Sequence, residues 1–191
     1  GSVTQLVVNG RGGVAGDAAA VVLNVAVTGT ERAGYLTVYP CDAPRPLASN
    51  LNYSAGQTIA NTVTSKVSAN GKVCIYTSGP THLIADINGY FAAGASFAAL
   101  APGRLLETRV GEASTVDGLF WKMGQRSTGS VTQLVVNGRG GVASNAAAVV
   151  LNVAVTGTER GGYLTVYPCD APRPLASNLN YSAGQTIANT V

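Results

Sequence analysis

The sequence predicts an all-β fold made of tandem β-sandwich units of about 128 residues with Greek-key or jelly-roll-like topology. First, residues 1–63 (the first copy) return as residues 129–191 (the second copy) with a constant offset of 128. Second, short runs of alternating apolar and polar residues recur between turn sequences. Third, the single run with helical spacing, Ile59, Val63 and Val67, is filled with Thr, Val and Ser, which favour strands.

A propeller-like or solenoid β-repeat is the alternative architecture, because tandem β-units also build blades and coils. A propeller blade takes about 40–50 residues. The interval between the copies here is 128 residues. The sequence therefore favours the sandwich.

Period-two alternation marks the individual strands. It is clearest in residues 19–28, where every odd position from Val21 to Val27 is apolar. In residues 35–39, Leu36 and Val38 face away from the two tyrosines, and Pro40 ends the run. The other predicted strands are residues 4–9, 49–53, 58–67, 72–77, 82–91 and 105–110.

Glycine-rich turns separate these strands. Asn70-Gly71 between Val67 and Val73 predicts a hairpin. Residues 9–13 superficially resemble a phosphate-binding loop, but they lack the Gly-Lys-Ser/Thr ending and no helical pattern follows. We interpret this segment as a second hairpin turn. The copies differ only at Gly16/Ser144, Asp17/Asn145 and Ala33/Gly161, and all three differences are expected in turns.

The repeat also suggests domain boundaries. Alternation gives way to small residues over 92–103, which indicates a linker. Residues 1–91 are then the C-terminal part of one unit, and residues 104–191 the N-terminal part of the next. In this frame each part lacks strands that the other contains, so apolar strand edges are left open. We expect the missing strands to come from a neighbouring copy, either a copy in another molecule of a fibre or the continuation of the same long polypeptide.

The three cysteines fit the same frame. Cys41 and Cys74 lie in one unit, whereas Cys169 is the copy of Cys41 and has no counterpart of Cys74 after it. We predict a Cys41–Cys74 disulfide, with Cys169 either unpaired in this chain or paired to a cysteine supplied from outside it. Disulfides persist mainly in oxidising compartments, so this pairing predicts an extracellular protein.

Composition narrows the function further. The net charge of +3 is spread without any Lys/Arg run, which argues against nucleic acid as a partner. No apolar run approaches the roughly 20 residues that span a bilayer. The acidic residues show no ligand spacing, and we expect neither a metal nor another cofactor. His82 is the single histidine; with Asp86 on the same strand face a catalytic pair is conceivable, but a polar strand face is the preferred interpretation, and we expect no enzyme.

Six segments of the chain form a recognisable set: Ala20-Val21-Val22-Leu23-Asn24-Val25, Gly34-Tyr35-Leu36-Thr37-Val38-Tyr39-Pro40-Cys41, Ala48-Ser49-Asn50-Leu51-Asn52-Tyr53, Ala55-Gly56-Gln57-Thr58, His82-Leu83-Ile84-Ala85-Asp86-Ile87-Asn88-Gly89-Tyr90-Phe91 and Arg104-Leu105-Leu106-Glu107-Thr108-Arg109. Together they resemble a repeat found in large exported proteins of actinobacteria. The resemblance covers nearly the whole chain and implies a secreted or cell-surface location with many tandem copies; it implies no catalytic residues.

Five tyrosines are the remaining candidates for a functional surface. Outward-facing tyrosines on a weakly charged sheet can stack on sugar rings or on another protomer. The leading hypothesis is a structural repeat of an extracellular fibre, stalk or surface layer, whose partners are copies of itself. The alternative is an adhesive module that binds cell-surface glycan by avidity. The candidate residues are Tyr35, Tyr39, Tyr53, Tyr76 and Tyr90.

Overall fold

The computed structural model describes all residues from 1 to 191 and contains strands, turns and irregular segments but no helix. Two compact units are present. Unit 1 comprises Gly1–Arg45, Ser49–Ala101 and Val150–Val191, and unit 2 comprises Pro46–Ala48 and Pro102–Val149. The predicted all-β, sandwich-like class is confirmed, and the sheets do not close into a barrel. The frame of the repeat itself stays a prediction.

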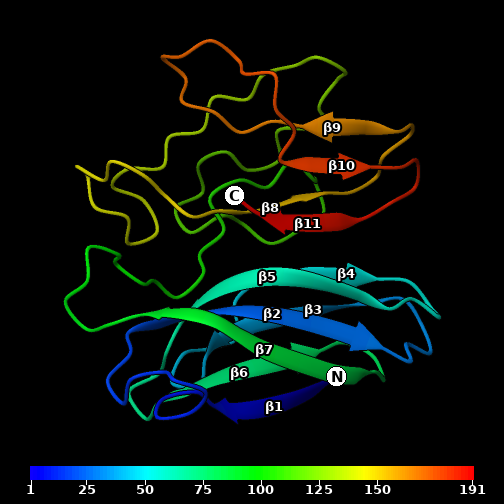
Figure 1. Cartoon of the computed structure of the whole chain (residues 1–191). Helices are drawn as coiled ribbons and strands as arrows, with labels where there is room; N and C mark the ends of the chain where they lie inside the picture. Colours follow the sequence, from blue (N-terminus) through cyan, green and yellow to red (C-terminus); the bar gives the residue numbers. More distant parts are fainter. The chain divides into compact units, whose positions relative to one another are not determined.

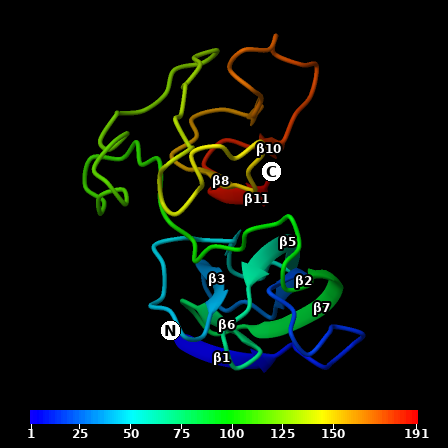
Figure 2. The ribbon, with the colours of Figure 1, turned by 90° about the vertical axis from the view of Figure 1, so that its left-hand side faces the viewer.

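Two of the antiparallel sheets of unit 1 form the sandwich (Figures 1 and 2). The first sheet has the order β1-β6-β3-β4, and the second has the order β5-β2-β7. Their strands are β1 (Ser2–Val7), β2 (Ala20–Thr28), β3 (Gly34–Pro40), β4 (Leu51–Tyr53), β5 (Ile59–Lys66), β6 (Lys72–Thr77) and β7 (His82–Phe91). Most strand ends lie within two residues of the predicted ones.

The core lies where the inward faces of the two sheets meet. The odd positions of β2 from Val21 to Val27 are buried, while the even positions from Val22 to Thr28 are only half-buried, as period two requires. They pack against Leu36 and Val38 of β3 and against Val73 and Ile75 of β6. Alternation in sequence therefore becomes burial on one face, which is the main apolar stabilisation of the unit.

Consecutive strands mostly switch sheets, and this corrects both hairpin predictions. The Asn70-Gly71 turn joins β5 and β6, which belong to different sheets, and residues 9–13 join β1 to β2 across the sandwich. The turn chemistry itself was predicted well, because Gly71 has a positive φ of 74° and its N–H donates to the carbonyl of Ser68 at 2.9 Å. A turn signal fixes the local backbone but not the sheet that each flanking strand joins.

The second copy reproduces part of this arrangement in β8 (Asn152–Val155), β9 (Gly162–Leu164), β10 (Leu179–Tyr181) and β11 (Ile187–Thr190). The pair β9–β10 repeats the register of β3–β4, and β8–β11 repeats that of β2–β5, each with an offset of 128. However, residues 130–135, identical in sequence to β1, form no strand. β1 pairs only with β6, and no strand of the structure pairs with residues 130–135. The expectation of identical strands in both copies is therefore wrong for this segment.

Unit 2 is largely irregular. The predicted strand at residues 105–110 is absent, and a single bridge joins Glu107 to Trp121. The backbone N–H of Glu107 donates to the carbonyl of Phe120, and the N–H of Lys122 donates to the carbonyl of Glu107. The Glu107 side chain pairs with Arg104 and Arg109. By contrast, the expected turn placement of the three copy differences is confirmed, because all six residues are exposed and lie outside strands.

Candidate functional site

The two copies of the sequence contact each other within unit 1. The Thr190 hydroxyl donates to the carbonyl of Thr62 at 2.8 Å, and the Asn61 amide donates to the carbonyl of Ala188 at 3.3 Å. A third bond runs from the Asn152 amide to the carbonyl of Ser49 at 2.7 Å. We call these three bonds the inter-copy contact. The first two bonds join β5 to β11, which occupy equivalent positions in the repeat, and the third joins β8 to the residues before β4.

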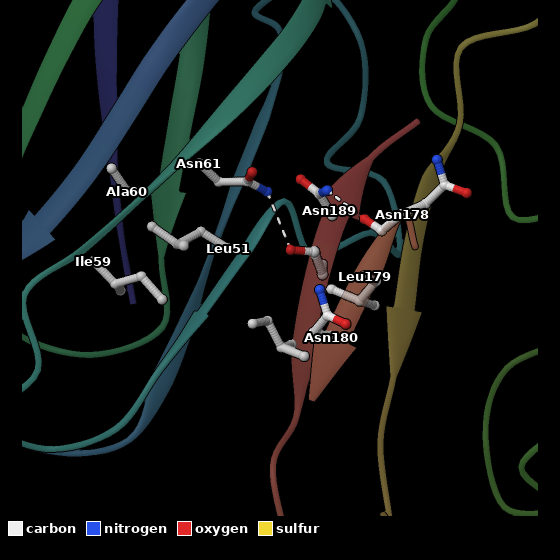
Figure 3. A pocket seen from close by; sticks show the side chains of 10 residues that line it. Leu51, Ile59, Ala60, Asn61, Asn178, Leu179, Asn180 and Asn189 are labelled. Atoms are coloured by element: carbon white, nitrogen blue, oxygen red, sulfur yellow. Dashed lines mark hydrogen bonds between the residues drawn. The ribbon is translucent and has the colours of Figure 1, made fainter. Parts of the chain in front are cut away.

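A hollow of about 280 Å³ lies beside this contact (Figure 3). Four positions line it in both copies, so the same sequence motif contributes to two of its walls. Its walls carry amide and aliphatic groups, without a carboxylate, an amine, a thiol or an imidazole. Such a lining can donate and accept hydrogen bonds and exclude water, but it offers no acid, base or nucleophile. The residues are Leu51, Ile59, Ala60 and Asn61 from the first copy and Asn178, Leu179, Asn180, Ile187, Ala188 and Asn189 from the second.

Asparagines position the strands around the hollow. In the first copy, buried Asn50 accepts the N–H of Val38 at 2.8 Å, and Asn61 donates to the carbonyl of Asn50 at 2.7 Å. The second copy repeats both bonds at the same distances. The Asn178 side chain accepts the N–H of Val166, and the Asn189 amide donates to the carbonyl of Asn178. Asn50, just before β4, is thereby bonded to β3 and to β5. Asn178, just before β10, makes the equivalent two bonds in the second copy. Sequence reasoning assigned these residues no role, although their recurrence in the Ala-Ser-Asn-Leu-Asn-Tyr motif was the available signal.

The predicted aromatic surface forms only in part. Tyr35 and Tyr76 lie on neighbouring strands β3 and β6 with ring centroids 5.7 Å apart. The Arg45 guanidinium lies 3.9 Å from the centroid of the Tyr76 ring and donates to the Tyr35 hydroxyl at 3.3 Å. Cation–π attraction therefore holds this cluster together. Tyr90 is exposed, but it belongs to β7 of the other sheet.

Tyr39 and Tyr53 are corrections to that prediction, because both are buried. Tyr53 belongs to the core, and its register partner on β3 is Gly34. A Cβ atom at Gly34 would collide with the Tyr53 hydroxyl, so the glycine leaves room for the ring. Gly162 and Tyr181 repeat this pairing in the second copy. Leu51 and Tyr53 share the buried face of β4, as period two requires, and this corrects the expectation that Tyr53 faces outward.

The cysteines behave as predicted. Cys41 and Cys74 form a disulfide with their Cα atoms 4.9 Å apart, and Cys169 is free and exposed. The bond ties the end of β3 to the middle of β6. Nearby, the Asp42 carboxylate accepts the N–H of Ala69 at 2.8 Å, which fixes the loop that follows Cys41.

Unit 2 contains a polar cluster that sequence reasoning missed. The guanidinium of buried Arg139 donates to both carboxylate oxygens of Asp117, at 2.6 and 2.8 Å, and to the carbonyls of Val135, Leu105 and Leu119. The hydrogen bonds from Arg139 lower the pKa of Asp117 to about 2. Its equivalent in the first copy, Arg11, is exposed and reaches only the carbonyl of Val7. An arginine inside a glycine-rich turn was the signal that could have revealed this role.

Glu107 is the second charged centre of unit 2. Its buried carboxylate accepts hydrogen bonds from the Arg104 and Arg109 side chains and from the backbone N–H of Arg109. The hydrogen bond from the Arg109 side chain is the main reason that the pKa of Glu107 falls to about 2. Arg104 also donates to the carbonyl of Leu47, which attaches residues 46–48 to the unit. These ion pairs organise a segment that has few strands of its own.

His82 and Asp86, the catalytic pair considered from the sequence, are not hydrogen-bonded to each other. Asp86 accepts a hydrogen bond from Asn24 at 3.5 Å, and no bond joins it to His82. No cluster of three or more His, Cys, Asp or Glu side chains is arranged to hold a metal ion. The structure also has no helix with the length and apolarity to cross a membrane. No protein-family model, curated protein or solved structure matches the chain.

Proposed function

We propose that the chain is a structural repeat of an extracellular fibre, stalk or surface layer, and that its copies associate through β-strand contacts. The observation that carries this proposal is the inter-copy contact, in which Thr62 and its own repeat, Thr190, are hydrogen-bonded. A surface that recurs at a fixed interval along a chain can make the same contact many times. The disulfide and the lack of a membrane-spanning helix are compatible with an extracellular location.

The chemistry of the contact supports association rather than catalysis. Its bonds join uncharged amide and hydroxyl groups to backbone carbonyls, and the hollow beside it contains no titratable side chain. The strength of such neutral hydrogen bonds varies little with pH. Each bond is weak, so association of the copies depends on many repeats of the contact.

Sedimentation velocity and negative-stain imaging of the full chain test this proposal. We expect concentration-dependent association into elongated particles, because copies in neighbouring molecules can make the contact that the two copies make within one chain. The double variant Asn61→Asp, Thr190→Asp places carboxylates against carbonyl oxygens and should suppress association. The matched control, Asp17→Asn, copies the residue that already stands at position 145 and should leave association unchanged. A chain that stays monomeric at every accessible concentration contradicts the proposal.

A glycan-binding module is the second candidate, supported by the Tyr35, Tyr76 and Arg45 cluster. Paired aromatic rings and a guanidinium are suited to stack on and hydrogen-bond a sugar. Retention on a polysaccharide column tests it. Tyr76→Ala should abolish the retention, and Tyr90→Ala on the opposite sheet should not. Equal elution of these variants and the parent chain contradicts this candidate.

A further inference from the structure

The guanidinium of Arg45 lies on the outer face of the sheet β1-β6-β3-β4. It is 3.9 Å from the centroid of the Tyr76 ring, and it donates a hydrogen bond to the Tyr35 hydroxyl at 3.3 Å. This face is the outer one because Ile75, which precedes Tyr76 on β6, belongs to the core and points the other way. Val3, the register partner of Tyr76 on β1, is 52% exposed on the same face. We call Val3, Tyr35, Arg45 and Tyr76 the Arg45 cluster.

Arg45 has no carboxylate partner. All four ion pairs of the structure belong to unit 2, and none involves Arg45. Asp42, the acidic residue nearest to it in sequence, accepts the backbone N–H of Ala69 at 2.8 Å. A guanidinium has five N–H donors, and the bond to Tyr35 uses one of them. Because Arg45 is exposed, the other donors can reach a ligand.

The two tyrosines fix this cation before any ligand binds. Cation–π attraction to Tyr76 and the hydrogen bond to Tyr35 restrict the Arg45 side chain, so less conformational entropy is lost on binding. In unit 2, by contrast, Arg139 is neutralised by the Asp117 carboxylate. Neutral phenol rings leave the charge of Arg45 uncompensated. A fixed, uncompensated guanidinium can bind a planar anion through two parallel N–H···O bonds.

The surroundings of Arg45 favour a carboxylated sugar over other anions. The backbone N–H groups of Tyr35 and Ser78 already donate to the Ser78 hydroxyl and to the Tyr35 carbonyl, so they form no nest for a phosphate or sulfate group. Strands β3 and β6 each have a partner on both sides, so the cluster offers no strand edge to an acidic peptide. Tyrosine hydroxyls can bond sugar hydroxyls, and the exposed Val3 side chain can contact sugar C–H groups.

We propose that the Arg45 cluster binds a uronic acid unit of an acidic polysaccharide. The guanidinium pairs with the sugar carboxylate, and the hydroxyls of Tyr35 and Tyr76 bond the sugar hydroxyls. This rests on the second candidate function, glycan binding, and names the class of glycan that the site takes. Each contact is weak on its own, so binding to a polymer of uronic acids depends on many sites acting together.

The experiment measures binding of the full 191-residue chain to immobilised polygalacturonate by biolayer interferometry, with the fully methyl-esterified polymer as the neutral probe. We expect the ester to bind at least about tenfold more weakly, because it lacks the charge-assisted hydrogen bonds. Arg45→Gln should weaken binding to polygalacturonate by a similar factor. Arg45→Lys should weaken it less, since an ammonium keeps the charge but lacks the planar fork. The matched control, Arg11→Gln, removes the same charge from an exposed arginine beside the other end of β1 and should change the apparent Kd by less than about twofold.

Four results overturn the inference. Equal binding of the acidic and esterified polymers removes the acidic-sugar assignment, while glycan binding stands if Tyr76→Ala still abolishes it. Binding of neither polymer also overturns it, and retention on a neutral polysaccharide column then decides glycan binding separately. Equal losses from Arg45→Gln and Arg11→Gln would mean that net charge alone attracts the polymer. Polyglutamate is the peptide probe, and binding as tight as that of polygalacturonate, with the same dependence on Arg45, would assign the cluster to acidic peptides.

Discussion

Thr190 donates its hydroxyl proton to the carbonyl of Thr62, the residue that occupies the same place 128 positions earlier in the repeat. The two threonines do not contribute in the same way, because one supplies its side chain and the other its backbone. Identical sequences thus meet through different groups. This asymmetry allows the two sides of the contact to be tested separately.

Thr190→Val should loosen β11. The substitution removes a hydroxyl donor and keeps a β-branched side chain, so the lost hydrogen bond is the main effect. We expect the opening free energy of the 187–190 amides in hydrogen exchange to fall by about 0.5–1 kcal/mol. Thr62→Val is the matched control, because it leaves the Thr62 carbonyl in place and alters an exposed side chain. Equal effects of both substitutions would show that the contact has no role.

Replacing Cys41 and Cys74 together by serine should destabilise unit 1. The bond closes a loop with a sequence separation of 33. The loop-entropy relation gives a loss of about 3.5–4 kcal/mol in the free energy of unfolding. Urea denaturation followed by far-ultraviolet circular dichroism measures it. Cys169→Ser changes an exposed, unbonded copy of Cys41 and should leave the curve unmoved; a similar loss from it would contradict the assignment.

Alternation and turn residues were sufficient to predict the strands of the first copy. β6 and β7 were predicted at their observed ends, because their apolar faces alternate and Gly or Pro residues flank them. The Cys41–Cys74 pairing also followed, since the repeat explained the third cysteine. The strand ends depend on local sequence, and the cysteine pairing follows from the positions of the three cysteines in the repeat. Neither prediction required knowing which strands pair.

Partner choice could not be predicted. β1 pairs with β6 across more than 60 residues, and alternation states which side chains share a face but not which strand lies alongside. The segment 130–135 shows this directly, because it has the sequence of β1 and yet forms no strand. A strand at a sheet edge depends on its neighbour for hydrogen bonds. Arg139 was missed for a related reason, because its acceptors come from residues 105 to 135.

Arg139→Ala should destabilise unit 2. Removal of the guanidinium takes away the hydrogen bonds that Arg139 donates to the Asp117 carboxylate and to the carbonyls of Val135, Leu105 and Leu119. Fluorescence of Trp121, the single tryptophan of the chain, follows this unit. We expect a decrease in Tm of about 5–10 °C. Arg11→Ala alters the equivalent but exposed position and should change Tm by less than about 2 °C. Equal decreases in Tm from Arg139→Ala and Arg11→Ala would contradict a stabilising role for the hydrogen bonds between Arg139 and Asp117.

The stability of unit 2 should fall in acid. The arginine hydrogen bonds hold the pKa of Glu107 and of Asp117 at about 2 in the folded chain, whereas unfolded Glu and Asp titrate near about 4. Between these values the unfolded state binds protons that the folded state does not, so the free energy of unfolding decreases as the pH falls from about 4.5 to about 2. Above about pH 5 both states are ionised, and these two groups give no further change.

Urea titrations read by Trp121 at a series of pH values measure this slope. Glu107→Gln removes one titrating group, and adding Asp117→Asn removes the second, so the slope should decrease in two steps. Both variants also lose charge-assisted hydrogen bonds, and for that reason the comparison uses the slope with pH rather than the stability at one pH. Asp17→Asn, an exposed change in unit 1, should leave the slope intact. If the double variant keeps the parent slope, other carboxylates cause the acid sensitivity and the Arg139–Asp117 and Arg109–Glu107 pairs do not.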